Sequence, residues 1–288
     1  MCVVWGIPYL LIKVAVRDLQ PATLVFFRTG IGAALLVPIA VGRHQLGWLR
    51  DRWKPLVIYT VIEIAIPWVL LSTAEQRLPS SLSGLLVAAV PLVGAVASRA
   101  VTDREALGAR GVSGLLIGLL GVAALVGLDV GTADIGSVAI VGVVVVGYAI
   151  GPLILAHALG DLPSLGVVAA SLGLCAVGYA PYALTHLPAR TPPPHVIAAI
   201  VVLGVVCTGA AFVLFFHLIA EVGPVRAVVI TYVNPAVAVL LGVAFLGEAF
   251  STGTAVGFAL ILTGSYLATR PARMVPTDRH PLAAVPEP

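Results

Sequence analysis

Long apolar stretches, separated by short polar breaks, make up most of this chain. Ten such stretches can be distinguished, and most approach the roughly 20 residues that a helix needs to cross the hydrocarbon of a bilayer. They lie near 2–16, 22–41, 55–74, 80–98, 107–127, 135–156, 163–185, 196–219, 225–246 and 251–269. They are too long and too uniformly apolar for the alternating strands of a membrane barrel. Because backbone groups in lipid must bond within their own segment, we predict ten transmembrane helices.

The composition agrees with a chain that is surrounded by lipid. Of 288 residues, 60% are hydrophobic and only 10% are charged, and the mean hydropathy is +1.09. A soluble domain has about 25% charged residues. Cys2, Cys175 and Cys207 lie in apolar stretches without the spacing of a metal or redox motif, so we expect small hydrophobic side chains and no metal. The small net charge of +3 does not suggest a nucleic-acid partner.

Basic residues in the connectors predict the orientation. If the N-terminus is cytoplasmic, eleven Lys and Arg residues fall in inside segments, and only Arg17, Arg77 and Arg190 fall outside. Basic residues accumulate on the cytoplasmic side, so both termini are expected in the cytoplasm. The Arg-rich composition favours a bacterial source and therefore the inner membrane. The first stretch has only about 15 residues and lacks the features of a signal peptide, so we expect either further residues upstream or a short span.

The sequence repeats itself at a separation of 143 or 144 residues. The matched pairs are Asp18 and Asp161, Leu19 and Leu162, Gly30 and Gly173, Pro38 and Pro181, Pro91 and Pro235, Glu105 and Glu248, Gly114 and Gly257, and Gly121 and Gly264. We therefore predict two five-helix units, 1–127 and 135–269, followed by a Pro-rich, disordered cytoplasmic tail at 270–288. Because five is odd, the second unit enters the membrane from the opposite side. The predicted fold is all-α and integral to the membrane, with two inverted repeats, which is typical of secondary transporters.

Two segments also resemble a known family. "WGIPYLLIK" and "LQPATLVFFRTGIGAALL" resemble the opening of the EamA-type repeat of the drug/metabolite transporter superfamily. "FHLIAEVGPVRAVVITYVNPAVAVLLGVAFLGE" and "GTAVGFALILTGSYLA" resemble its closing segment. The resemblance implies ten helices in two inverted repeats that surround a central cavity. It also implies that the protein transports small metabolites. One departure is the first-half turn, which has "TDREAL" in place of Leu-Gly-Glu.

Three ionisable residues in the apolar stretches are the first candidates for a transport site. Insertion of a charge at membrane depth costs about 2.5–3.5 kcal/mol, so each is by default a functional hypothesis. Lys13 either lines the pathway or extends to the headgroups. Arg28 either lines the pathway or ties helices through backbone carbonyls, and Glu63 lies near the midplane. Their second-half counterparts are Ala156, Ser171 and Cys207, so the charge is asymmetric, as expected for a site that binds one asymmetric solute.

Further candidates are polar or aromatic side chains in the apolar stretches. They are Tyr9, Tyr59, Tyr148, Tyr232, His217 and Asn234 for the pathway, and Pro91 and Pro235 for kinks. Trp5 and Trp68 could also line a cavity, but aromatic residues near span ends are at least as often interface anchors, so they are not included. Glu105 and Glu248 are interpreted as turn or helix-start residues. The glycine pairs Gly114/Gly118, Gly147/Gly151 and Gly253/Gly257 predict close helix packing, within the monomer or between monomers.

No nucleotide-binding, hydrolase or metalloprotease motif is present, and the connectors are too short for an ATPase domain. We therefore predict a non-enzymatic secondary transporter without cofactors, driven by an ion or proton gradient. Its solute would be amino acid-like or drug-like, and efflux is the expected direction. The alternatives are an integral-membrane enzyme acting on a lipid-linked substrate and a non-transporting scaffold. The expected partners are a small-molecule substrate and the bilayer, and the protein would be a monomer or homodimer.

Overall fold

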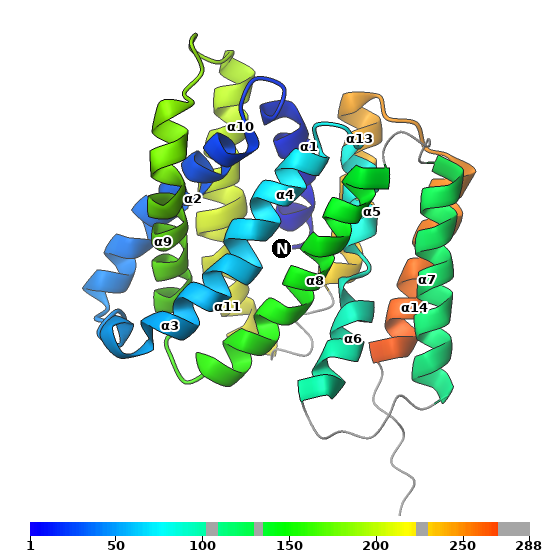
Figure 1. The fold of residues 1–288 in the computed structure, drawn as a ribbon, viewed down its shortest axis with the longest axis horizontal. Helices are drawn as coiled ribbons and strands as arrows, with labels where there is room; N and C mark the ends of the chain where they lie inside the picture. Colours follow the sequence, from blue (N-terminus) through cyan, green and yellow to red (C-terminus); the bar gives the residue numbers. More distant parts are fainter. Residues whose placement is uncertain (102–108, 130–134, 223–229, 270–288) are drawn as a thin grey trace, which may run out of the picture.

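The computed structural model describes residues 1–101, 109–129, 135–222 and 230–269, which form helices and their connections with no strand in these ranges (Figure 1). The helices are α1 (Cys2–Ala15), α2 (Pro21–Gly42), α3 (Leu49–Tyr59), η1 (Thr60–Ala65), α4 (Ile66–Ala74), α5 (Ser80–Val87), α6 (Val90–Val101), α7 (Ala109–Asp129), α8 (Ile135–Ala158), α9 (Ser164–Thr185), α10 (Pro194–Gly204), η2 (Val205–Ala210), α11 (Ala211–Val222), α13 (Ile230–Leu246) and α14 (Thr252–Thr269). The two η segments are π-helical.

Each predicted span corresponds to an apolar helical stretch of the described chain. Six are long and apolar enough to cross a membrane: Pro21–Gly42, Leu49–Ala74, Ser80–Ser98, Ile135–Ala158, Ser164–Thr185 and Pro194–Leu218. Four shorter apolar helices complete the set: Cys2–Ala15, Ala109–Leu125, Val233–Leu246 and Thr252–Ala268. The predicted tail at 270–288 and the turn that holds Glu105 lie outside the described residues.

Prolines and a glycine mark several helix ends. Pro21 opens α2 and Pro194 opens α10, where the missing N–H has no helical partner to lose. Gly247, in the connection after α13, has a φ of 65°, which glycine adopts without a Cβ penalty. The fourth span is divided, because α5 ends before Pro91 and α6 begins at Val90. Pro235, in contrast, lies inside α13.

The third span of each unit contains a π-helical segment in its middle. η1 lies between α3 and α4, and η2 lies between α10 and α11. A π segment leaves the regular i→i−4 hydrogen-bond pattern and is frequent at functional sites. Each segment packs on the second helix of the other unit, η2 on α2 and η1 on α9. The two irregular segments therefore face the boundary between the units.

Equivalent helices of the two units pack against each other. α2 packs on α9, and α7 packs on α14 (Figure 1). The contact of α1 with α13 has its equivalent in the contact of α8 with α6. Such reciprocal contacts are expected when a two-fold axis relates two copies of one unit. The predicted all-α integral membrane fold with two inverted repeats is therefore confirmed.

Repeated glycines allow α7 and α14 to approach closely. A Cβ added to Gly121 would lie 2.7 Å from the backbone nitrogen of Ile261. A Cβ added to Gly264 would lie 2.5 Å from the carbonyl oxygen of Gly114. Gly114 and Gly257 of the predicted pairs take part in the same contact, so they pack helices within the monomer.

Glu248, in the connection between α13 and α14, caps the N-terminus of α5. Its Oε1 accepts hydrogen bonds from the backbone N–H and the hydroxyl of Ser80, at 2.7 and 3.0 Å. Its Oε2 accepts a hydrogen bond of 2.9 Å from the backbone N–H of Ser81. A carboxylate at a helix N-terminus satisfies backbone donors and interacts favourably with the helix dipole. Glu248 is thus a helix-start residue, although the helix belongs to the other repeat.

Candidate functional site

Arg28 lies in the interior of the bundle and contacts both repeats. The residue is only 8% exposed. Its Nε–H donates a hydrogen bond of 3.0 Å to the hydroxyl of Thr208 in η2. Its guanidinium carbon lies 3.7 Å from the centre of the Trp68 ring in α4. Both contacts are made to side chains. In the described chain Arg28 is therefore not held by backbone carbonyls, which was the alternative to a role in lining the pathway.

Trp68 belongs to this site, although it was left out of the candidates because aromatic residues near span ends are often interface anchors. Its ring is buried and stacks on the cation of Arg28. A cation over an indole face is worth about 0.5–2 kcal/mol, with the higher values in desolvated sites. No salt bridge joins Arg28 to a carboxylate in the described residues. A buried cation that is only partly compensated in this way attracts an anionic group.

Two of the predicted tyrosines flank this cation. Tyr9 is buried on α1, and Tyr148 is partly buried on α8. Both lie within electrostatic range of Arg28. α1 and α8 are the first helices of the two repeats, so the cation lies between equivalent elements. The structure thus brings three predicted residues together: Arg28, Tyr9 and Tyr148.

Glu63 lies in η1 and packs against α8 at a position where only glycine fits. A Cβ on Gly151 would collide with the Glu63 carboxylate. The Oε2 atom of Glu63 is buried and has no hydrogen-bond partner in the described residues. Tyr148, one turn before Gly151 on α8, is within electrostatic range of Glu63. Glu63 therefore borders the same region as Arg28, across the boundary between the repeats.

Glu75 is a second buried carboxylate that was not among the candidates predicted from the sequence. It directly follows α4, just beyond the predicted third span at 55–74. In the structure its exposure is 0%, and it lies within electrostatic range of Arg28. The only sequence signal for it is its position one residue after a long apolar run.

Lys13 is held by the end of α4. Its ammonium group donates hydrogen bonds to the carbonyl oxygens of Glu75, at 2.6 Å, and Leu78, at 2.8 Å. Carbonyls at a helix C-terminus lack intrahelical partners, and a cation there is favourable. In this structure Lys13 therefore ties α1 to the connection after α4, a role that the sequence analysis did not consider.

The remaining candidates are not among the groups that interact with Arg28 in the described part of the chain, or their side chains lie outside it. Tyr59 is buried with Leu159 and Val167. His217 is exposed on α11, and Asn234 is partly buried on α13. The side chain of Tyr232 lies outside the described part. The roles of these residues, and those of Pro91 and Pro235 as hinges, remain predictions.

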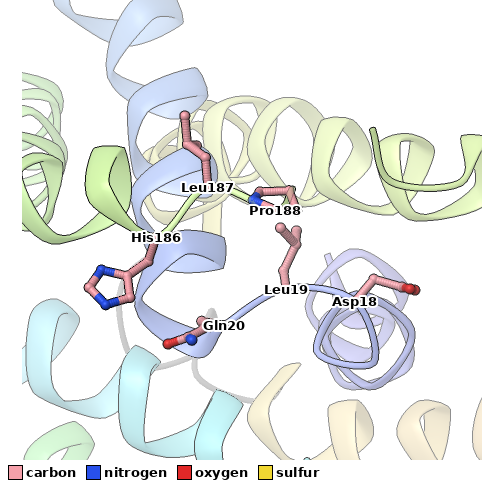
Figure 2. A pocket seen from close by; sticks show the side chains of 6 residues that line it. All are labelled: Asp18, Leu19, Gln20, His186, Leu187 and Pro188. Carbon is pink, nitrogen blue, oxygen red and sulfur yellow. The ribbon is translucent and has the colours of Figure 1, made fainter. Parts of the chain in front are cut away.

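Two surface hollows lie at one end of the bundle, which we call the upper end because Figure 1 draws it at the top. One has a volume of about 350 Å³ and is lined by Asp18, Leu19, Gln20, His186, Leu187 and Pro188 (Figure 2). The other, of about 370 Å³, is lined by residues 16–21 and Gln76. Neither is lined by Arg28 or Glu63, so the predicted cavity between the repeats remains a prediction.

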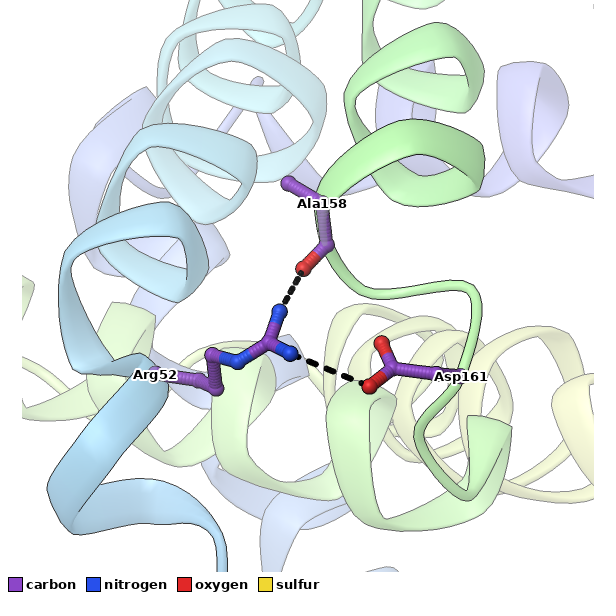
Figure 3. Close-up of polar contacts among 3 residues, drawn as sticks. All are labelled: Arg52, Ala158 and Asp161. Atoms are coloured by element: carbon purple, nitrogen blue, oxygen red, sulfur yellow. Dashed lines mark hydrogen bonds and ion pairs between the residues drawn. The ribbon is translucent and has the colours of Figure 1, made fainter.

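The opposite, lower end carries an ion pair between the repeats (Figure 3). Arg52 of α3 donates a hydrogen bond of 3.1 Å from Nη2 to the Asp161 carboxylate. Its Nη1 donates a second one of 2.9 Å to the carbonyl oxygen of Ala158, at the end of α8. The contact joins the connection after the second span to the one after the sixth span.

Two repeats of membrane helices around buried charges are the arrangement expected of a multi-pass membrane transporter. The chain belongs to the EamA-like transporter family, which matches residues 1–127 and 135–270. The resemblance seen in the sequence is therefore confirmed.

Individual relatives match over nearly the full length. The chain is 24% identical to an uncharacterized transporter of Archaeoglobus fulgidus, over 92% of this chain and 95% of the relative. It is 23% identical to the uncharacterized transporter YvbV of Bacillus subtilis, over 91% of this chain and 87% of the relative. A crystal structure that is 24% identical has the same fold, with a TM-score of 0.68 over 93% of this chain and 94% of that one.

Proposed function

We propose that this protein is a secondary-active transporter that exports a small metabolite, amino acid-like or drug-like, by alternating access between its two repeats. The connectors of the sequence leave no room for an ATPase domain, which supports transport driven by an ion or proton gradient. The bias of basic residues supports a bacterial inner-membrane location with both termini in the cytoplasm. In this orientation the upper end faces outward.

The buried guanidinium of Arg28 is the observation that carries this proposal. It belongs to the first repeat, donates to Thr208 of the second, and has no carboxylate partner among the described residues. A charged side chain at membrane depth that does not bind a helix end is expected to bind a solute or an ion. We assign to Arg28 the anionic group of an anionic or zwitterionic solute. Glu63, across the repeat boundary, either pairs with a basic charge or takes a proton when the carrier reorients.

Each end of the bundle has contacts that a change of access would break. At the lower end, Arg52 pairs with Asp161. At the upper end, Glu248 binds Ser80, and the hydroxyl of Tyr182 donates to Gln20. All of these contacts join one repeat to the other. Opening one end while keeping the contacts of the other would expose Arg28 to one side at a time.

Transport measurements in proteoliposomes test the proposal. A panel of anionic, zwitterionic and cationic solutes of similar size would be offered to the wild type and to Arg28→Gln, Arg28→Lys and Arg190→Gln. We expect saturable transport of at least one anionic or zwitterionic solute, with weaker apparent affinity in both Arg28 variants. Arg190→Gln, which removes an exposed arginine that lines neither hollow, is the matched control. Equal transport by the Arg28 variants and the wild type would refute the assignment of Arg28.

A further inference from the structure

Glu75 differs from every other carboxylate described here because its entire side chain is enclosed and neither of its oxygens accepts a hydrogen bond of normal geometry. The residue has an exposure of 0%. Both Oε1 and Oε2 are buried and lack such a bond in the described residues, and the backbone and the ammonium of Lys13 are favourable neighbours of the carboxylate. Glu63 has one such oxygen, and Glu248 uses both of its oxygens to cap α5. The proposed function assigns no role to Glu75.

The nearby cations are engaged by other groups. Lys13 interacts electrostatically with the carboxyl group of Glu75, but its ammonium donates to the carbonyl oxygens of Glu75 and Leu78. Arg28 is also in electrostatic range, but its Nε–H donates to Thr208. The other titratable groups that face Glu75 are Glu248, Tyr9 and Tyr148.

An enclosed carboxylate anion that accepts no hydrogen bond is unfavourable. Transfer of an ionised carboxylate out of water without such bonds costs so much that the group binds a proton instead. Glu248 adds a second negative charge nearby, which opposes ionisation of Glu75 further. A neutral carboxyl group is therefore the form that suits Glu75 in this conformation.

Glu75 is next in sequence to a residue that lines an open hollow. Gln76, the next residue, lines the hollow of about 370 Å³ at the upper end. On the other side, Trp68 precedes Glu75 by seven residues, or about 10 Å along a helix. Glu75 thus lies between water at the upper end and the cation that Trp68 covers.

We propose that Glu75 is the proton-binding carboxylate of this transporter and that it is loaded from the hollow beside Gln76. The carboxylate takes a proton from hydronium, which leaves water, and returns it to water when the site opens to the other side. The proton is held in the conformation described here. The role in coupling rests on the proposed function, whereas the proton-binding state itself does not.

Infrared spectroscopy can detect the proton without any solute. A protonated carboxyl group has a C=O stretch separate from that of a carboxylate, and this stretch shifts in D2O. At neutral pH we expect the wild type to show this band. The component of the band that belongs to Glu75 should be absent in Glu75→Gln and present in Glu63→Gln. A Glu75→Gln spectrum identical to that of the wild type would overturn the proposal.

A second variant covers the case in which Glu75→Gln does not fold. Glu75→Asp keeps a carboxyl group, so the band should move in position rather than disappear. A band that does not move in Glu75→Asp would show that it belongs to another residue and would overturn the proposal.

Vesicles then test the coupling. With a solute from the panel, an imposed pH gradient should change the transport rate of the wild type, and this response should be lost in Glu75→Gln. A normal response in a folded Glu75→Gln variant would overturn the coupling role. Absence of any transport by the wild type would contradict the proposed function, while the infrared result would still decide whether Glu75 holds a proton.

Discussion

Arg52 and Asp161 form an ion pair of 3.1 Å that joins the two repeats at the lower end of the bundle. Asp18 is the counterpart of Asp161 in the first repeat, and it lines the hollow of about 350 Å³ at the upper end. The same repeated aspartate therefore binds the other repeat at the lower end, whereas at the upper end it lines a surface hollow. The contacts that join the repeats at the upper end are made by other residues, Glu248 with Ser80 and Tyr182 with Gln20.

Loss of this ion pair is expected to favour opening at the lower end. The two side chains are 45% and 60% exposed, and exposed pairs of this kind contribute only about 0.2–1 kcal/mol. Arg52→Gln should therefore shift the balance between conformations modestly, up to about five-fold by the same estimate. Site-directed labelling at the lower end, at low and high salt, would measure the shift.

The exchanged pair Arg52→Asp with Asp161→Arg provides the control. The double variant should restore the labelling rate of the wild type, whereas each single variant should raise it. If the double variant behaves as the sum of the two single variants, the ion pair does not hold the lower end closed. High salt should raise labelling of the wild type and leave Arg52→Gln almost unchanged, because salt screens exposed charges.

Gly121→Ala should destabilise the protein by disturbing the contact of α7 with α14. The added methyl group would lie 2.7 Å from a backbone nitrogen of α14, and backbone cannot move aside as a side chain can. Overpacking of this kind costs about 1–3 kcal/mol. Thermal unfolding in detergent would measure the loss.

Gly178→Ala on α9 is the matched control, because a Cβ there would meet no atom within 4 Å. Alanine is favoured over glycine in a helix by up to about 1 kcal/mol, so this variant should be as stable as the wild type or more so. Equal stability of both variants would show that α7 and α14 can separate without cost.

Glu248→Ala should lower stability by removing the cap of α5. Loss of an N-cap side chain costs about 0.5–2 kcal/mol. Glu248→Gln should recover only part of this, because its NH2 group would face a backbone N–H of Ser80 or Ser81. Unfolding temperatures of both variants, compared with Glu221→Ala at an exposed position, would test this. Unchanged stability of Glu248→Ala would mean that water replaces the cap.

The helices could be predicted from the sequence because lipid demands long apolar segments. The repeat could also be predicted, since matched prolines and glycines survive in both halves, as in Gly121 and Gly264. The division of the fourth span into α5 and α6 was signalled by Pro91, although as a kink rather than a break. The π segments, TVIEIA and VVCTGA, were not predicted, because no residue pattern in them distinguishes a π turn from a regular helix.

The site could be predicted only in part. Arg28 and Glu63 are identifiable because a charge in an apolar run is rare. Thr208 and Trp68 are not, because uncharged residues of these types occur throughout such helices and their role depends on how helices cross. Glu75 was missed because the end of an apolar run does not show whether the next residue meets water or the protein interior.

The hydrogen bond from Arg28 to Thr208 leads to the last prediction. Thr208→Val keeps the shape of the side chain but removes the acceptor, so a buried guanidinium donor loses its partner. Leaving such a group unsatisfied costs about 1–3 kcal/mol, and more for a charged one. We expect this cost to appear as weaker solute affinity, because Arg28 would no longer be held in position. Ser171→Ala is the matched control: Ser171 is the counterpart of Arg28, and its buried hydroxyl has no partner in the described residues, so its loss should leave affinity unchanged. A double-mutant cycle with Arg28→Lys would measure the coupling, and strictly additive effects on affinity would show that Thr208 does not act through Arg28.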